Sequence, residues 1–212
     1  MRNMIGQMAA GVSVLSDDAT LTKIIWAERA EGWTQTAEDH AIKAGRLNMR
    51  RPGTQPRVKD PDAVFNVFGA TVEQNDLLTI GEKVWLVWSV QESPAGSHAR
   101  TSVVSLPTTE AALLAEVKTP DGGGGYTKEF PAAQDAPKAL GYFTRGAVDR
   151  NAGVEGTATA NDALFLTDFH TLPVDLATVQ RVSIAGQSWQ LLGWEPVPDN
   201  LAFYALRLGT LT

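Results

Sequence analysis

The strongest constraint on this chain is a repeated segment that recurs at about half the chain length. Residues 76–90 align with residues 180–194 at a shift of 104, which places Trp85 on Trp189. Upstream, residues 62–65 align with residues 162–165 at a shift of 100, so the two blocks are four residues further apart in the second copy. Duplication of a unit close to half the chain predicts two similar domains.

Each copy of the repeat has the pattern of a β-hairpin. Gly81-Glu82 separates two strand-like runs with glycine first, which is typical of a type II′ turn, and Ala185-Gly186 occupies the same place in the second copy. After the first turn, both alternating sets of side chains are largely apolar, so both faces are expected to be covered. We therefore expect Trp85 and Trp189 to be buried in hairpin cores.

The order of these patterns predicts a mainly β protein made of two related small β-barrel or sandwich units. They are joined by a short helix and a loop rich in glycine and proline. The helix is expected after Pro107, with Thr108 or Thr109 as its cap and the run to Val117 extending it. A weaker capping pattern at Thr36 suggests another short helix. The expected organisation is an N-terminal arm (1–18), a first β unit (19–106), a helix and flexible linker (107–139) and a second β unit (140–212).

Composition excludes several classes of protein. The chain has no cysteine, which rules out disulfides, thiolate metal sites and a cysteine nucleophile and is expected of a protein made in a reducing cytosol. No apolar run is long enough to predict a membrane-spanning helix. The first residues carry one positive charge and no long apolar core, so they do not predict a secretory signal.

Charge is unevenly distributed along the chain. The net charge is −6, yet one segment without any acidic residue holds six basic ones. An acidic protein with one basic segment favours docking of that segment on an acidic partner or local phosphate contact over general nucleic-acid binding. The alternative is a solvated loop. The candidate contact residues are Lys43, Arg46, Arg50, Arg51, Arg57 and Lys59.

Patterns that would carry a reaction are scarce. The three histidines have no metal-binding spacing, and no cofactor or metal site is predicted. The run Gly122, Gly123, Gly124 and Gly125 lacks the Gly-Lys-Ser/Thr of a phosphate loop, so it is a tether or a mobile loop that orders on assembly. Scattered carboxylates such as Asp60 and Asp76 are the residues that glycoside hydrolysis would need, and six tryptophans could stack on sugars. The repeat of Trp85 at Trp189 favours core packing for those two.

The hairpins resemble those of the small β-barrel head–tail connector proteins of tailed bacteriophages. The family pattern is Gly-Asp, alternating apolar residues, a glycine-containing turn, then an aromatic residue and valine. Residues 75–87 are similar to it, with Asn75-Asp76 in place of Gly-Asp, and residues 182–196 with the closing 206–208 are more similar still. The Gly-Asp is lost at Gln180-Arg181, and the unit is doubled here, whereas familiar connectors are often single.

This resemblance implies a structural virion protein and not an enzyme. Copies would form a homo-oligomeric ring around the DNA channel of the phage neck, assembled in the host cytoplasm, between the portal or an adaptor and the tail proteins. Residues 43–59 or 119–138 would then reach a neighbour, the portal or the channel. The alternatives are another tail or baseplate protein and a carbohydrate-binding or glycan-cleaving β-protein.

Overall fold

The chain forms two compact units, residues Met1–Leu106 and Pro107–Thr212. The structure is a computed structural model that describes residues 16–29, 32–47, 59–93, 96, 98–145 and 163–211. Most of the N-terminal arm that we expected over 1–18 lies outside the described residues. Within the described part of the chain, the only helices are two short 3₁₀ turns, η1 (Phe169–Thr171) and η2 (Leu176–Thr178). The expectation of a mainly β protein with two small barrel units is confirmed.

The first unit is a closed barrel of six strands, in the order β1-β2-β3-β6-β5-β4 around the sheet. All neighbouring pairs are antiparallel, and β1 pairs with β4 to close the barrel. Its strands are β1 (Asp17–Arg29), β2 (Gly32–Leu47), β3 (Ala63–Phe68), β4 (Leu77–Ile80), β5 (Lys83–Glu92) and β6 (Ala99–Ser105).

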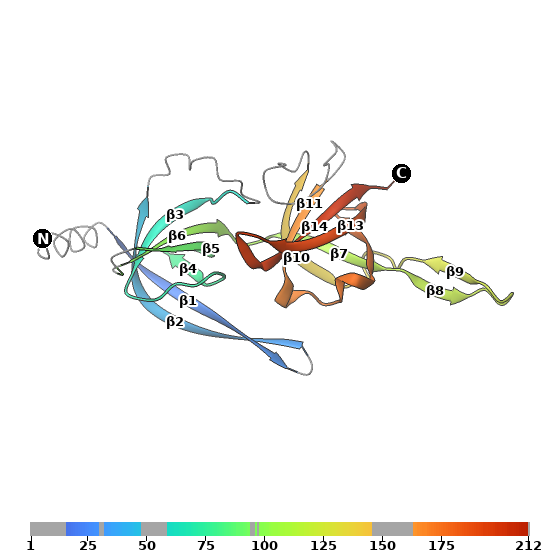
Figure 1. Cartoon of the computed structure of the whole chain (residues 1–212), viewed down its shortest axis with the longest axis horizontal. Coiled ribbons are helices and arrows are strands. Elements are labelled where there is room, and N and C mark those ends of the chain that lie inside the picture. The colour runs from blue at the N-terminus through green and yellow to red at the C-terminus, as the bar shows by residue number, and fades with distance from the viewer. Residues whose placement is uncertain are drawn as a thin grey trace, which may run out of the picture. The chain divides into compact units, whose positions relative to one another are not determined.

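The second unit is a closed barrel in the order β10-β11-β14-β13-β12-β7, with a separate two-stranded sheet β8-β9 (Figure 1). The pairing of β12 with β7 closes this barrel, just as the pairing of β4 with β1 closes the first barrel. Its strands are β7 (Thr109–Ala115), β8 (Val117–Pro120), β9 (Tyr126–Glu129), β10 (Lys138–Arg145), β11 (Ala163–Asp168), β12 (Val179–Ile184), β13 (Gln187–Val197) and β14 (Asn200–Thr210).

The two barrels have the same topology, and the repeated hairpins occupy the same place in each. Leu78 pairs with Trp85 across β4 and β5, and Val182 pairs with Trp189 across β12 and β13. Both hairpins also have a register shift at corresponding positions, between Val87 and Ser89 in β5 and between Leu191 and Gly193 in β13. A shared bulge is a specific backbone feature, because it places one extra residue in the strand. The structural repeat therefore agrees with the alignment made from sequence.

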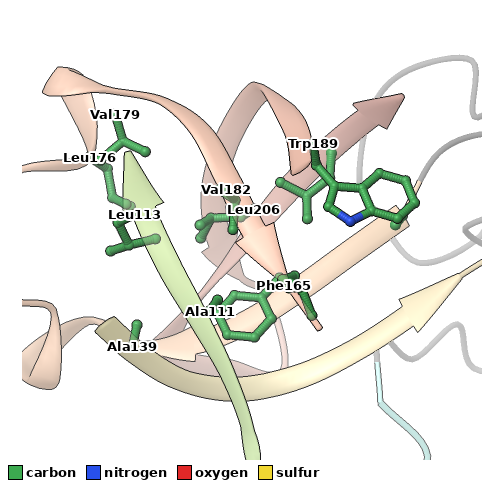
Figure 2. Close-up of a cluster of buried hydrophobic side chains, with 12 residues drawn as sticks. Ala111, Leu113, Ala139, Phe165, Leu176, Val179, Val182, Trp189 and Leu206 are labelled. Carbon is green, nitrogen blue, oxygen red and sulfur yellow. The ribbon is translucent and has the colours of Figure 1, made fainter. Parts of the chain in front are cut away.

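Each barrel encloses its own apolar core. The core of the second unit gathers around Phe165, Val182 and Trp189, with Leu206 and Ala111 beside them (Figure 2). Trp189 is buried, as expected, and its ring meets that of Phe143 at 5.6 Å between centroids. The corresponding core of the first unit contains Leu21, Phe65, Val67, Leu78, Val87 and Val103.

Trp85 differs from its repeat partner, because it is only half-buried at the margin of the first core. Its ring lies 6.3 Å from that of Phe65, measured between centroids. The fully buried indole of this hairpin is Trp88, at 1% exposure. Trp88 lies at the register shift between β5 and β6. Like the buried Leu86, it does not belong to the core cluster that holds Val87, so alternation along β5 places it on the other face of the strand.

The helix predicted after Pro107 is wrong, because this segment is strand β7. It occupies the position in the second barrel that β1 occupies in the first, so the second unit begins at residue 107 and not at 140. Ala111 and Leu113 belong to the barrel core, whereas Ala112 and Leu114 pack on the other side against Phe130 and Ala136. Because both faces of β7 are buried, its sequence has no polar–apolar alternation to signal a strand.

Two other expectations about local structure are also corrected. The segment at Thr36, where a short helix was expected, is part of strand β2 and is paired with β1. The segment expected as a linker over 119–138 contains the β8–β9 pair, followed by residues 130–137 that return to the barrel. Leu113 donates a backbone hydrogen bond to the carbonyl of Pro137 at 2.8 Å, so this return segment is held against β7.

Candidate interaction surface

Each unit carries a two-stranded hairpin that extends beyond its barrel (Figure 1). In the first unit, β1 pairs with β4 only through residues 20–22 and β2 pairs with β3 only through residues 43–47, so the rest of the β1–β2 hairpin is held by its own ladder. In the second unit, the β8–β9 hairpin follows β7 and precedes β10. The two hairpins therefore occupy corresponding positions in the two barrels.

The β8–β9 hairpin (residues 117–129) is exposed throughout both of its strands. Its ladder joins Val117 to Glu129, Lys118 to Lys128, Thr119 to Thr127 and Pro120 to Tyr126. Val117 is 52% exposed and Tyr126 is 66% exposed. An isolated two-stranded hairpin is marginally stable in water, so such a hairpin gains from a surface to pack on.

The tip of this hairpin is the glycine run that we expected to be a tether or mobile loop. One Asp121 carboxylate oxygen accepts hydrogen bonds from the backbone N–H groups of Gly123 and Gly125, each at 2.9 Å. Gly122 and Gly124 have φ values of +76° and +88°, which favour glycine. A Cβ atom on Gly125 would meet the Asp121 side chain at 2.4 Å. These glycines thus form a specific turn between two strands.

The base of each hairpin is held by the same kind of hydrogen bond. Leu21 pairs with Leu78, and Leu113 pairs with Val182, so these are corresponding pairs in the two barrels. Three residues further along the first strand of each pair are Ile24 and Glu116. The N–H of Ile24 donates to Asp76 Oδ1 at 3.3 Å, and that of Glu116 donates to Gln180 Oε1 at 2.8 Å.

Asp76 and Gln180 are corresponding residues in the sequence repeat. Two different side chains therefore supply one oxygen acceptor where the strand leaves the barrel and continues into the hairpin. Gln180 in place of an aspartate keeps this acceptor, because an amide carbonyl accepts a hydrogen bond as a carboxylate does.

Asp76 is almost fully buried and also accepts from the N–H of Glu73 at 2.8 Å. Burial raises the pKa of this carboxyl above its usual value, although the hydrogen bonds from Glu73 and Ile24 and the charge of Lys23 oppose the increase. Asp76 is thus a structural acceptor in the barrel wall and not a solvated loop carboxylate.

Asp62 links the start of β3 to the end of β6. Its Oδ2 accepts from the N–H and from the hydroxyl of Ser105, both at 2.7 Å, and Lys59 Nζ lies 3.8 Å from Oδ1. Partial burial raises the pKa of Asp62, but the two Ser105 hydrogen bonds and Lys59 outweigh that effect, so its pKa is lowered. This carboxylate also serves the fold.

The base of the β8–β9 hairpin has a second support outside the barrel. Arg181 Cζ lies 4.0 Å from the centroid of the Phe130 ring, just after β9. Lys128 Nζ lies 3.2 Å from Glu116 Oε1 across the hairpin. The two ends of the hairpin are therefore fixed on the barrel while its strands remain exposed.

The structure describes three of the six basic residues predicted as a contact segment. Lys43 and Arg46 lie on β2 and are exposed, and Lys43 Nζ forms an ion pair of 2.5 Å with Asp18 Oδ1. Lys59 is engaged near Asp62. Arg50, Arg51 and Arg57 lie outside the described residues.

The remaining titratable groups lie at separate places in the described ranges. No cluster of three or more potential metal ligands occurs among these residues. His98 packs against Phe68, and His170 Nδ1 lies 2.9 Å from Asp168 Oδ1. A hollow of about 410 Å³ in the first unit has Glu92 and His98 as its titratable lining groups.

Exposed tryptophans occur once in each unit, at Trp33 and Trp194. The hairpin tryptophans Trp88 and Trp189 are buried, so neither repeated hairpin presents a row of indoles for stacking. In the described ranges, no helix has the length and apolar character needed to cross a membrane. The exposed hairpins are the most distinctive surfaces of the two units.

Sequence reasoning missed the β8–β9 hairpin, although a signal was present. The Pro120-Asp121 pair followed by four glycines is a strong turn signal, and short β-prone runs flank it.

Comparison with protein families, with curated proteins and with solved structures finds no match to this chain.

Proposed function

We propose that this chain is a structural virion protein of the neck of a tailed bacteriophage, where copies form a ring that joins the portal and head to the tail. The observation that carries this proposal is the pair of six-stranded barrels with one topology, each with a hairpin extending from the same place. The proposal extends the resemblance of the repeated hairpins to connector proteins.

Several physical features favour an assembly role over catalysis. Closed barrels leave no unpaired sheet edge, so they are stable bodies on which extended contacts can be mounted. A ring needs one surface to contact a different surface on the next copy, and two non-identical units provide such surfaces. The net charge of −6 also suits a channel through which DNA slides, because phosphate binding grows with cationic charge.

In this proposal, the partners are other copies of the chain, the portal or an adaptor on one side, and tail proteins on the other. Packaged DNA makes non-specific contact at most. The site of action is the virion neck, with assembly in the host cytoplasm. The protein has no catalytic role and needs no cofactor.

The test is to purify the chain, measure its mass in solution and co-express it with the portal and tail proteins encoded beside it. We expect a ring-sized oligomer that co-purifies with at least one of them, and labelled chain at the neck of particles in electron micrographs. A strict monomer that ignores both partners would contradict the proposal. Label on the tail tip or baseplate, or a positive glycan-binding or hydrolysis screen, would instead support the alternatives.

A further inference from the structure

Two lysines face each other in the β8–β9 hairpin without an obvious structural benefit. Lys118 and Lys128 are direct cross-strand partners, so their side chains project from the same face. Like charges placed directly opposite each other destabilise a two-stranded sheet. Lys128 is partly compensated by Glu116, whereas Lys118 makes no ion pair with any residue that the structure describes. This arrangement suits a hairpin whose charge is balanced by another molecule.

The lysine face has an apolar component as well. Pro120 and Tyr126 are the next pair on the same side of the ladder, and the Tyr126 side chain is 66% exposed. We define the lysine face as Lys118, Pro120, Tyr126 and Lys128. A projecting aromatic ring beside two cations fits an acidic protein surface with an exposed aromatic residue.

The outer face of the β1–β2 hairpin has the complementary chemistry. Leu21 is fully buried in the barrel core, so residues offset from it by an odd number along β1 face outward. The outward cross-strand pairs include Thr22 with Asp39 and Glu28 with Trp33. Asp39 and Glu28 are exposed, and Trp33 is 38% exposed. We define this outward set, Glu28, Trp33 and Asp39, as the acidic face.

We propose that the lysine face of the β8–β9 hairpin of one copy docks on the acidic face of the β1–β2 hairpin of a second copy of this chain. The contact joins unlike surfaces, so repeating it yields a ring or a filament. This inference rests on the proposed ring but names its contact. Nucleic acid is the alternative occupant, because phosphates would also pair with the two lysines, and the measurements below distinguish the two.

The test measures the mass of the full chain by analytical ultracentrifugation over a range of concentration and salt. Lys118→Gln/Lys128→Gln should weaken association roughly tenfold and reduce its salt dependence. Thr119→Glu/Thr127→Glu is the matched control, because it changes the net charge equally on the opposite face of the hairpin. The control should assemble like the wild type, and circular dichroism should show both variants folded.

A charge-swap cycle identifies the partner surface. Lys118→Glu/Lys128→Glu alone and Glu28→Lys/Asp39→Lys alone should both fail to assemble, whereas the chain that carries all four changes should recover assembly. The proposal is overturned if the wild type stays monomeric, if the lysine variants assemble normally, or if the four-fold variant is not restored. It is equally overturned if the lysine variants lose affinity for double-stranded DNA while their oligomeric mass is unchanged.

The neck proposal and this contact can fail separately. Assembly that ignores the lysine and acidic faces would overturn the contact and leave the ring intact. A charge-dependent oligomer that is absent from the neck of particles would support the contact and contradict the neck assignment.

Discussion

At the scale of single residues, Asp76 makes a pH-dependent contribution whose sign follows from its raised pKa. The folded chain holds the Asp76 proton more tightly than the unfolded chain, whose carboxyl titrates near 3.8. The stability that this group contributes is therefore complete below pH 3.8 and is lost as pH rises through the raised pKa. Asparagine does not titrate, so the free energy of unfolding of Asp76→Asn should rise relative to that of the wild type as pH increases through this window.

Urea denaturation of the two proteins at a series of pH values measures this difference. Asp62→Asn is the matched control of opposite sign, because the pKa of Asp62 is lowered. The stability that Asp62 contributes is complete above pH 3.8 and is lost as pH falls through its lowered pKa. The loss of unfolding free energy caused by Asp62→Asn should therefore be smaller at acid pH. A stability difference between Asp76→Asn and wild type that stays constant with pH would contradict the assignment.

Ala185 gives a second prediction at this scale. It is exposed and has a φ of +50°, followed by Gly186 at +79°, so both turn residues are left-handed. A residue with a Cβ atom loses about 1 kcal/mol in this region, whereas asparagine tolerates it and Asn-Gly is the preferred pair for a type I′ turn. Ala185→Asn should raise the melting temperature, and Ala185→Val should lower it. A lower melting temperature for Ala185→Asn would refute this account.

The tryptophans show where residue-level prediction from sequence succeeds and where it stops. Burial of Trp189 follows from alternation along a regular hairpin, and the structure confirms it. Trp88 is fully buried, whereas Trp85 lies half-buried at the margin of the first core. Both faces of β5 are apolar, so the degree of burial on each face depends on strands distant in sequence, which local alternation does not report.

At the scale of elements, β7 shows the same limit. The sequence from Thr109 to Lys118 satisfies local rules for a helix, with a cap, good helix formers and suitably placed charges. Its four residues Ala111–Leu114 are nevertheless buried on both faces, by the barrel core and by the return segment after β9. Tertiary contacts on two sides override helix propensity, and neither contact is visible in the segment itself.

The base of the β8–β9 hairpin yields an element-scale prediction. Gln180→Ala removes the acceptor for the Glu116 N–H, a bond whose net contribution is about 1 kcal/mol. Hydrogen exchange at the Glu116 amide should accelerate about fivefold, with little change in the core amides of the barrel. Gln190→Ala, at an exposed glutamine of β13, is the control and should leave Glu116 unchanged. Equal exchange at Glu116 in Gln180→Ala and wild type would show that this bond does not hold the hairpin.

At the scale of the whole molecule, the repeat in the sequence predicts the number and class of the units but not their limits. Similarity between the copies is confined to the hairpins and the strand before them, so it identifies β4 with β12, β5 with β13 and β3 with β11. The strands that begin each barrel, β1 and β7, share no recognisable sequence. For this reason the sequence predicts a start of the second unit at residue 140 instead of residue 107, and its projecting hairpin is not recognised.

The limits of the second unit can be tested by expressing it alone. A fragment of residues 107–212 contains all six strands of the closed barrel and should fold cooperatively, as should its matched counterpart, residues 1–106. A fragment of residues 140–212 lacks β7, so β10 and β12 would each lose a partner and the core would lose Ala111 and Leu113. Exposed edges and an open core should leave this shorter fragment unfolded or aggregated.

Thermal denaturation followed by near-ultraviolet circular dichroism distinguishes these outcomes, because only a packed core gives Trp189 a fixed environment. If residues 140–212 fold as well as residues 107–212, β7 is dispensable and the barrel is not the folding unit. If only the longer fragment folds, β7, the strand whose sequence predicts a helix, is needed to complete the second barrel. It is then also needed for the fixed base from which the β8–β9 hairpin extends.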